Sequence, residues 1–181
     1  MKGLIILVDY FEDVEALCTI DILRRSSIEV DTVSLDKKNI TTQSNNKIEV
    51  QYLLNEVDVN SYDFLILPGG KAVFNTLDKE KRIDDLVDLF YNSNKLICAI
   101  CAAPRLLAKR GYFKNLKFTI FPGCLDGEVL GKNVDKGVVV EDKLITAKSM
   151  YYTTQFALEI INKLQGKQQR KLIEKQIKGI K

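Results

Sequence analysis

The sequence predicts an α/β fold in which helices cover both faces of a mostly parallel sheet. Four apolar runs are typical of strands buried in a parallel sheet, and segments with helical apolar spacing lie between them. The runs cover residues 2–8, 28–35, 62–67 and 96–100. Strands that alternate with helices pack as a parallel sheet covered on both faces, so this order defines the fold class. The 181 residues, 46% hydrophobic and 28% charged, suffice for one domain with a sizeable core.

Helical spacing of apolar residues marks the connections between these strands. We expect helices over residues 14–25, 71–93, 105–110 and 153–164. The first has acids at its start and arginines at its end, as the helix dipole favours. The last is closed by Gly166.

Shorter strands are expected outside the four buried runs. Weak alternation over residues 39–52, around Ser44-Asn45-Asn46, predicts a hairpin. Residues 117–121 predict a short strand, and residues 138–147 predict two more across the turn at 141–143.

A strand turns abruptly into a helix at Cys101. The apolar run ends at this residue, and Ala102-Ala103-Pro104 open a helical pattern that Gly111 stops. This is the geometry of a nucleophile elbow, which holds one reactive side chain at the carboxyl end of the sheet. The N–H groups at the helix start point to the same place and favour an anion there. A buried structural cysteine is the alternative, but the strand-to-helix break favours a functional one.

Several candidate functional residues follow strands directly. Asp9, the turn Pro68-Gly69-Gly70 and Cys101 each come after a predicted strand, and the helix that carries Glu15 begins near the first. Ligands of such sheets bind beyond the carboxyl ends of the strands, so these residues are expected to converge on one edge. Lys71 follows the glycines without the pattern of a phosphate-binding loop and is expected at the surface.

Composition excludes several classes of chemistry. The chain has no His, which excludes a Cys–His or Ser–His pair and imidazole metal ligands. A carboxylate, a lysine, a tyrosine or water must then move protons, and we expect no metal and no cofactor. No apolar run is long enough to cross a bilayer, and the opening run lacks the form of a signal peptide, so a cytoplasmic location is expected.

The four cysteines match neither a disulfide framework nor a zinc site. Cys98 and Cys101 form a Cys-x-x-Cys string, but Cys98 lies inside the strand, so a thioredoxin-like redox pair is rejected. We expect Cys98 and Cys18 in the core. Cys124 follows Pro122-Gly123 in a loop. Two alternatives stay open for it: an exposed cysteine that can oxidise, or a buried one.

We expect one domain over residues 1–166 and a basic helical extension over residues 167–181. The extension has six Lys or Arg residues and one acid, whereas the main domain has no basic excess that would favour nucleic acid. Its aliphatic residues share one helical face: Leu172, Ile173, Ile177 and Ile180. Packing on the domain or on a dimer partner is favoured, and contact with an anionic membrane or nucleic acid is the alternative.

Four motifs stand in a specific order along the chain. They are Glu12-Asp13-Val14-Glu15 with Ile20-Asp21-Ile22-Leu23-Arg24-Arg25, then Leu67-Pro68-Gly69-Gly70, then Ala99-Ile100-Cys101-Ala102-Ala103-Pro104, and last Phe156-Ala157-Leu158. In these motifs the chain resembles the ThiJ/PfpI superfamily, in the branch of the Parkinson-associated DJ-one protein and its bacterial relatives, over roughly residues 2–166. The resemblance implies a flavodoxin-like three-layer α/β sandwich that usually forms a homodimer.

The resemblance also implies roles for individual residues. Cys101 is the elbow cysteine, Glu15 is the carboxylic acid that touches its sulfur, and the N–H groups of Gly70 and Ala102 bind an oxyanion. A thiol must ionise to attack, and a Glu15 that stays protonated can donate a hydrogen bond to the thiolate. Burial favours protonated Glu15 and the helix start favours ionised Glu15; we expect burial to prevail.

Gly69, Phe121 and Tyr151 are expected to line the pocket. Two departures from the family pattern lie among them. Phe121 stands where many members have a histidine that transfers protons, which implies slow glyoxalase turnover. Residues 149–152, Ser-Met-Tyr-Tyr, replace a Gly-Pro-Gly turn, so the border of the pocket is bulkier and a tyrosine there can offer a hydroxyl group.

Two functions of different classes follow. The favoured one is a cysteine-dependent enzyme of the glyoxalase or deglycase type, in which Cys101 attacks a small reactive carbonyl such as methylglyoxal and Glu15 shuttles the proton. The alternative is an oxidative-stress sensor or redox-regulated chaperone in which Cys101 is oxidised to a sulfinate. The peptidase role attributed to some relatives relies on a histidine, which this chain lacks.

Overall fold

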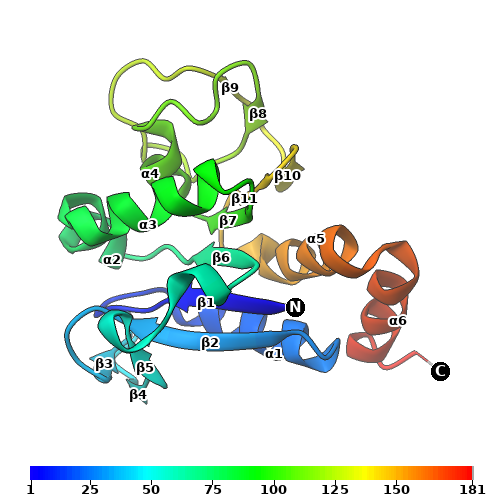
Figure 1. Ribbon diagram of the computed structural model, residues 1–181. Helices are drawn as coiled ribbons and strands as arrows, with labels where there is room; N and C mark the ends of the chain where they lie inside the picture. Colours follow the sequence, from blue (N-terminus) through cyan, green and yellow to red (C-terminus); the bar gives the residue numbers. More distant parts are fainter. Residues whose placement is uncertain (181) are drawn as a thin grey trace.

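Seven strands form one central sheet in the computed structural model, which describes residues 1–180 (Figure 1). The spatial order is β10-β11-β7-β6-β1-β2-β5. The strands are β1 (Lys2–Ile6), β2 (Glu29–Ser34), β5 (Tyr52–Leu53), β6 (Phe64–Leu67), β7 (Leu96–Ile100), β10 (Val138–Val140) and β11 (Leu144–Ala147). All neighbours pair in parallel except β10 and β11, which are antiparallel. The predicted mostly parallel α/β fold is confirmed.

Two small sheets flank the central one. The predicted hairpin is confirmed as β3 (Asn39–Thr41) paired antiparallel with β4 (Lys47–Glu49). The strand expected over residues 117–121 is shorter: only β8 (Lys117–Phe118) pairs, in parallel with β9 (Lys132–Asn133). Strand pairing stops there because the N–H of Thr119 donates to the Thr146 hydroxyl at 3.0 Å instead of to a ladder carbonyl.

Helices cover both faces of the central sheet (Figure 1). The regular helices are α1 (Thr19–Arg25), α2 (Ala72–Asn75), α3 (Lys81–Asn92), α4 (Pro104–Ala108), α5 (Thr153–Gln165) and α6 (Lys167–Ile177). Short helical turns are η1 (Val14–Cys18), η2 (Leu54–Glu56), η3 (Val59–Ser61), η4 (Leu77–Lys79) and η5 (Met150–Tyr152). In Figure 1, α1 and α5 lie side by side, and α3 covers the opposite face.

The helix expected over residues 71–93 is divided into α2, η4 and α3. Glu80 breaks the run, because its backbone is extended (φ −98°, ψ 110°) and its side chain accepts the N–H of Arg82 as the N-cap of α3. A capping carboxylate at the positive end of a helix stabilises that end. The apolar face of α3 is buried as its spacing predicts, through Ile83, Leu86, Val87 and Phe90.

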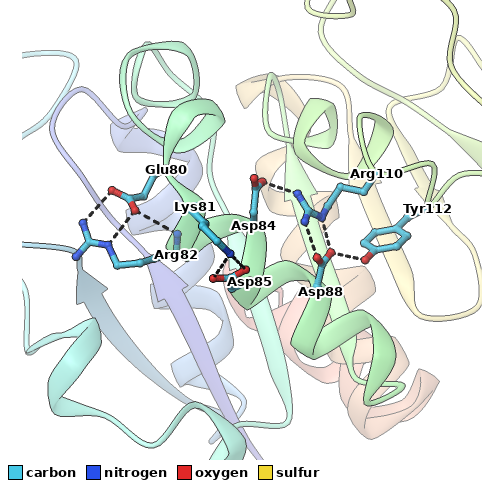
Figure 2. Close-up of polar contacts among 8 residues, drawn as sticks. All are labelled: Glu80, Lys81, Arg82, Asp84, Asp85, Asp88, Arg110 and Tyr112. Atoms are coloured by element: carbon cyan, nitrogen blue, oxygen red, sulfur yellow. Dashed lines mark hydrogen bonds and ion pairs between the residues drawn. The ribbon is translucent and has the colours of Figure 1, made fainter.

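Ion pairs join the polar side of α3 to the segment after α4 (Figure 2). Arg110 pairs with Asp84 and Asp88, and the Tyr112 hydroxyl donates to Asp88. The Tyr112 ring also stacks on Tyr91, with ring centroids 3.6 Å apart. These contacts lie at the end of the elbow helix, so they hold that helix against the sheet face that α3 covers.

Helix α6 packs along α5 through one buried residue, Ile173, and an ion pair between Arg170 and Glu159 at 3.4 Å. Of the aliphatic residues expected on one face, Ile173 is buried, whereas Leu172 and Ile180 are 49% and 56% exposed. None of the helices in residues 1–180 is long and apolar enough to span a bilayer.

The cysteines lie in different surroundings. Cys98 is buried inside β7, as expected. Cys18 is only half-buried, so its placement in the core was wrong; its sulfur lies 4.0 Å from the Thr154 hydroxyl. Cys124 is buried, because its carbonyl oxygen accepts a hydrogen bond from the Arg105 guanidinium and its N–H donates to Phe121.

Candidate active site

Three adjacent central strands converge at one edge of the sheet. β1 leads into the turn that carries Glu15, β6 ends at Gly69 and Gly70, and β7 ends at Cys101. Because β6 lies between β1 and β7 in the sheet, its glycine turn lies between the segment that carries Glu15 and the elbow that carries Cys101. The convergence expected from the order of strands and turns is therefore present.

Cys101 has the strained backbone of a nucleophile elbow. Its φ of +62° is in the left-handed region, which non-glycine residues rarely occupy and which costs about 1–3 kcal/mol. Two hydrogen bonds of 2.9 Å hold it: its N–H donates to Ala147 in β11, and its carbonyl accepts from the Phe121 N–H. The sheet and the loop after β8 thus fix the direction of the sulfur.

Glu15 lies in the π-helical turn η1 and is fully buried. Such turns are rare and occur frequently at functional sites. The turn directs Glu15 inward, although its neighbours Val14 and Leu17 are exposed. One carboxyl oxygen, Oε2, accepts the Gly69 N–H at 2.8 Å, and no donor in residues 1–180 bonds the buried Oε1. A carboxyl group with so few donors favours its neutral form.

The two glycines allow the backbone to approach the pair closely. A Cβ atom at Gly69 would lie 2.6 Å from the Cys101 Cβ and 2.7 Å from Glu15 Oε2. Gly70 has a φ of +89°, and a Cβ there would lie 2.5 Å from the Tyr10 carbonyl oxygen. Glycine is therefore required at both positions for steric reasons.

The Cys101 sulfur is surrounded by three polar groups. The N–H groups of Ala102 and Gly70 and the carboxyl group of Glu15 all lie close enough to this sulfur to shift the pKa of the thiol. These are the groups expected around an elbow cysteine. Because the two N–H groups are fixed by the backbone, they can stabilise negative charge on sulfur without rearrangement.

The ionisation of the two side chains is coupled. Burial raises the pKa of Glu15 to about 7, although hydrogen bonds with Gly69 and Cys101 oppose this shift. Burial and the Glu15 charge raise the pKa of the Cys101 thiol, while the N–H groups of Ala102 and Gly70 lower it. An ionised Glu15 therefore keeps the thiol protonated, and a protonated Glu15 removes that repulsion and can donate to a thiolate. The pair behaves as one unit that holds a single shared proton above about pH 7.

The β3–β4 hairpin holds two acids of the segment before Glu15. Glu12 accepts a hydrogen bond from Gln43, and Asp13 accepts hydrogen bonds from Ser44 and Asn46. Burial opposes the charge of Asp13, but its hydrogen-bond donors prevail and lower the pKa to about 2. Sequence analysis missed Gln43 because one glutamine in a polar hairpin gives no periodic or motif signal.

The remaining predicted pocket residues are placed differently. Phe121 contacts the elbow through its backbone, while its side chain is about half-exposed. Tyr151 is 85% exposed and lines a cavity of about 810 Å³ with Cys18 and Tyr152; Cys101 does not line that cavity. Lys71 is exposed, as expected. No group of three or more Cys, Asp or Glu side chains within residues 1–180 is arranged to hold a metal ion.

A parallel sheet with a strained cysteine elbow, a glycine turn and a buried glutamic acid defines a class of α/β proteins with a cysteine at the sheet edge. The sequence profile of the DJ-1/PfpI family matches residues 1–163, and the chain belongs to this family. Protein dj-1beta of Drosophila melanogaster is 32% identical to it over 173 residues, which cover 92% of this chain and 91% of that protein.

Other relatives agree with this assignment. Deglycase PfpI of Pyrococcus furiosus is 28% identical over 150 residues, which cover 82% of this chain and 90% of that protein. The crystal structure of a C103A mutant of a DJ-1 superfamily protein from Salmonella typhimurium superposes with a TM-score of 0.90 at 25% identity, covering 99% of this chain and 98% of that one. The match over nearly the full length confirms the flavodoxin-like sandwich.

The raised pKa of Glu15 makes stability depend on pH. The folded protein holds this proton up to about pH 7, whereas an unfolded carboxyl group loses it near pH 4.5, so unfolding becomes easier as the pH rises between these values. We expect the free energy of unfolding of wild type to fall by about 3 kcal/mol over this window relative to Glu15→Gln. Urea denaturation at several pH values measures this difference.

Glu49→Gln is the control, because Glu49 is an exposed glutamate of β4. The free energy of unfolding of Glu49→Gln, plotted against pH, should run parallel to that of wild type. If wild type and Glu15→Gln gave parallel plots, the claim that folding raises the pKa of Glu15 would be contradicted.

Proposed function

We propose that the protein is a cysteine-dependent enzyme of the glyoxalase or deglycase type that acts on small reactive carbonyls. One observation carries this proposal: the Cys101 thiol lies close enough to the N–H groups of Gly70 and Ala102 and to the buried carboxyl group of Glu15 for all three to shift its pKa. Such a site offers a nucleophile, a proton carrier and two donors for an oxyanion. Relatives named deglycases, such as PfpI of Pyrococcus furiosus, support it.

The first step forms a bond between sulfur and carbon. The Cys101 thiolate attacks the aldehyde carbon of an α-oxoaldehyde such as methylglyoxal, and the carbonyl electron pair moves to oxygen. The Gly70 and Ala102 N–H groups stabilise that oxyanion, and Glu15 supplies the proton that gives a hemithioacetal.

The second step is an internal redox reaction that needs no outside oxidant. The ionised Glu15 removes the proton from the former aldehyde carbon and returns it to the neighbouring carbonyl carbon, and the hydroxyl proton passes from the first oxygen to the second. The first carbon is thereby oxidised to a thioester and the second is reduced to an alcohol. Water then hydrolyses the thioester, releases lactate and restores the thiol. One water molecule is consumed for each methylglyoxal. With Phe121 where many family members have a histidine, Glu15 makes every proton transfer, and we expect slow turnover.

A second function is supported by the same donors. Peroxide can oxidise the thiolate in two steps to a sulfinate, each peroxide giving one oxygen atom and leaving as water. The N–H groups of Gly70 and Ala102 and a protonated Glu15 would hold the sulfinate oxygens. An oxidised DJ-1 of Toxoplasma gondii, 26% identical with a TM-score of 0.88, is among the similar structures. In this reading the protein is an oxidative-stress sensor or a redox-regulated chaperone.

We also propose that the protein is a homodimer in the cytoplasm, where a free thiol is maintained. Apolar side chains are exposed on two neighbouring elements: Val14 and Leu17 of η1, each 42% exposed, and Met150 and Tyr151 of η5. Both elements contact α5, and Cys18 of η1 and Tyr151 of η5 line the same cavity, so the two elements lie beside each other at the surface. A face of this kind is typical of an interface between subunits.

The enzymatic proposal predicts lactate formation from methylglyoxal. Cys101→Ser should reduce the rate by about a thousandfold, because the nucleophile is lost. Glu15→Gln should reduce it by about a hundredfold, because a hydrogen-bond donor remains but no group carries the proton. Cys18→Ser, a change at a half-buried cysteine outside the site, should keep wild-type activity. The proposal fails if wild type forms lactate no faster than Cys101→Ser.

The sensor proposal predicts selective oxidation. After mild peroxide treatment, intact-mass measurement should show a gain of two oxygen atoms in wild type and in Cys18→Ala. The gain should be absent in Cys101→Ala. Oxidation spread equally over the cysteines, or no oxidation, would exclude this function.

The dimer proposal predicts a mass of twice 20.6 kDa in sedimentation equilibrium. The double variant Val14→Glu, Leu17→Glu should sediment as a single chain, because charges on an apolar interface oppose association. Leu130→Glu, at an exposed leucine in a different loop, is the matched control and should stay dimeric. A monomeric wild type would contradict the proposal.

A further inference from the structure

We propose that Gln43 is a positioning residue, which fixes the turn that carries the Gly70 N–H donor against Cys101. This inference rests on the proposed function, in which that donor stabilises the thiolate and the oxyanion. Gln43 lies in the loop of the β3–β4 hairpin, far from Cys101 in the sequence, and it does not touch the sulfur.

Gln43 makes three hydrogen bonds to two different segments. Its side-chain NH₂ donates to Glu12 Oε2 at 2.7 Å, and its side-chain oxygen accepts the Lys71 N–H at 2.8 Å. Its backbone N–H donates to the Phe11 carbonyl at 2.9 Å. One amide side chain therefore joins the loop before Glu15 to the residue directly after Gly70.

These two segments are also joined beside Gln43. Phe11 and Gly70 form an isolated antiparallel bridge, and the Glu12 N–H donates to the Gly69 carbonyl at 3.2 Å. The Ala72 N–H donates to the Tyr10 carbonyl at 3.1 Å. The Gly70 backbone thus takes its position from the loop over residues 10–12, and the Gln43 side chain closes the connection on the solvent side.

The hairpin that carries Gln43 is itself anchored. Asp13 accepts hydrogen bonds from the Ser44 hydroxyl at 2.7 Å and the Asn46 amide at 2.9 Å. Asp9 accepts the Thr41 N–H at 2.8 Å. A glutamine fixed in this way can hold a backbone amide in place, whereas a glutamine on a free loop could not.

The Lys71 N–H belongs to the peptide unit that starts at the Gly70 Cα, so a hydrogen bond that holds this N–H restricts where Gly70 lies. If the turn relaxes, the Gly70 N–H moves away from the sulfur and from the oxyanion. Oxyanion donors act in the transition state and little in substrate binding, so the loss should appear in kcat and hardly in KM. The thiolate also loses a donor, so a higher pH is needed to form it.

Gln43→Met tests the proposal, because methionine keeps the size of the side chain and removes both of its hydrogen bonds. Gln51→Met is the matched control: Gln51 also accepts a backbone N–H, from Thr32 at 3.0 Å, beside β2 and away from Cys101. Three quantities are measured in both variants and wild type. They are the pH midpoint for alkylation of Cys101 by iodoacetamide, and kcat and KM for methylglyoxal.

In Gln43→Met we expect the alkylation midpoint to rise by about half a pH unit or more. We expect kcat to fall about tenfold with KM within about twofold. Gln51→Met should match wild type in all three. Wild-type midpoint and kcat in Gln43→Met would overturn the inference, as would equal changes in Gln51→Met.

If Gln43→Met does not fold, Gln43→Ser replaces it, since serine suits a turn and is too short to reach Lys71. If wild type makes no lactate, the proposed function fails, and the alkylation midpoint alone then decides the role of Gln43.

Discussion

The electrostatic coupling between the buried Glu15 carboxyl group and the nearby Cys101 thiol is the interaction on which the site depends. Burial raises the pKa of both groups, so neither ionises freely, and one proton is shared between them. The strained elbow, the π-helical turn and the adjacent glycines each serve this contact. The elbow aims the sulfur, the turn brings the carboxyl group inward, and Gly69 leaves room for both.

Much of this arrangement could be predicted from the sequence, because strand ends are marked by changes in residue type. The apolar run that stops at Cys101 and the Pro68-Gly69-Gly70 turn locate the sheet edge, and family motifs add Glu15. The contribution of Gln43 could not be predicted, and the prediction that Tyr151 lines the pocket of Cys101 was wrong. Their positions follow from tertiary contacts between distant segments, and neither periodicity nor spacing records such contacts.

The chain contains no histidine, so a different side chain must carry protons in the proposed chemistry. A carboxyl group with a pKa of about 7 can act near neutral pH, where an imidazole would otherwise serve. The same pair that would catalyse carbonyl chemistry would also stabilise an oxidised sulfur. The two proposed functions therefore share one physical basis, and they differ only in the reagent that reaches Cys101.

The shared proton is tested most directly by the alkylation rate of wild-type Cys101 between pH 5 and pH 10, followed by peptide mass. If Glu15 and Cys101 share one proton, the rate rises as the pair loses its first proton and levels off above about pH 7. A rate that rises about tenfold per pH unit through pH 9 would mean that the thiol ionises alone. That result would contradict the account of the site.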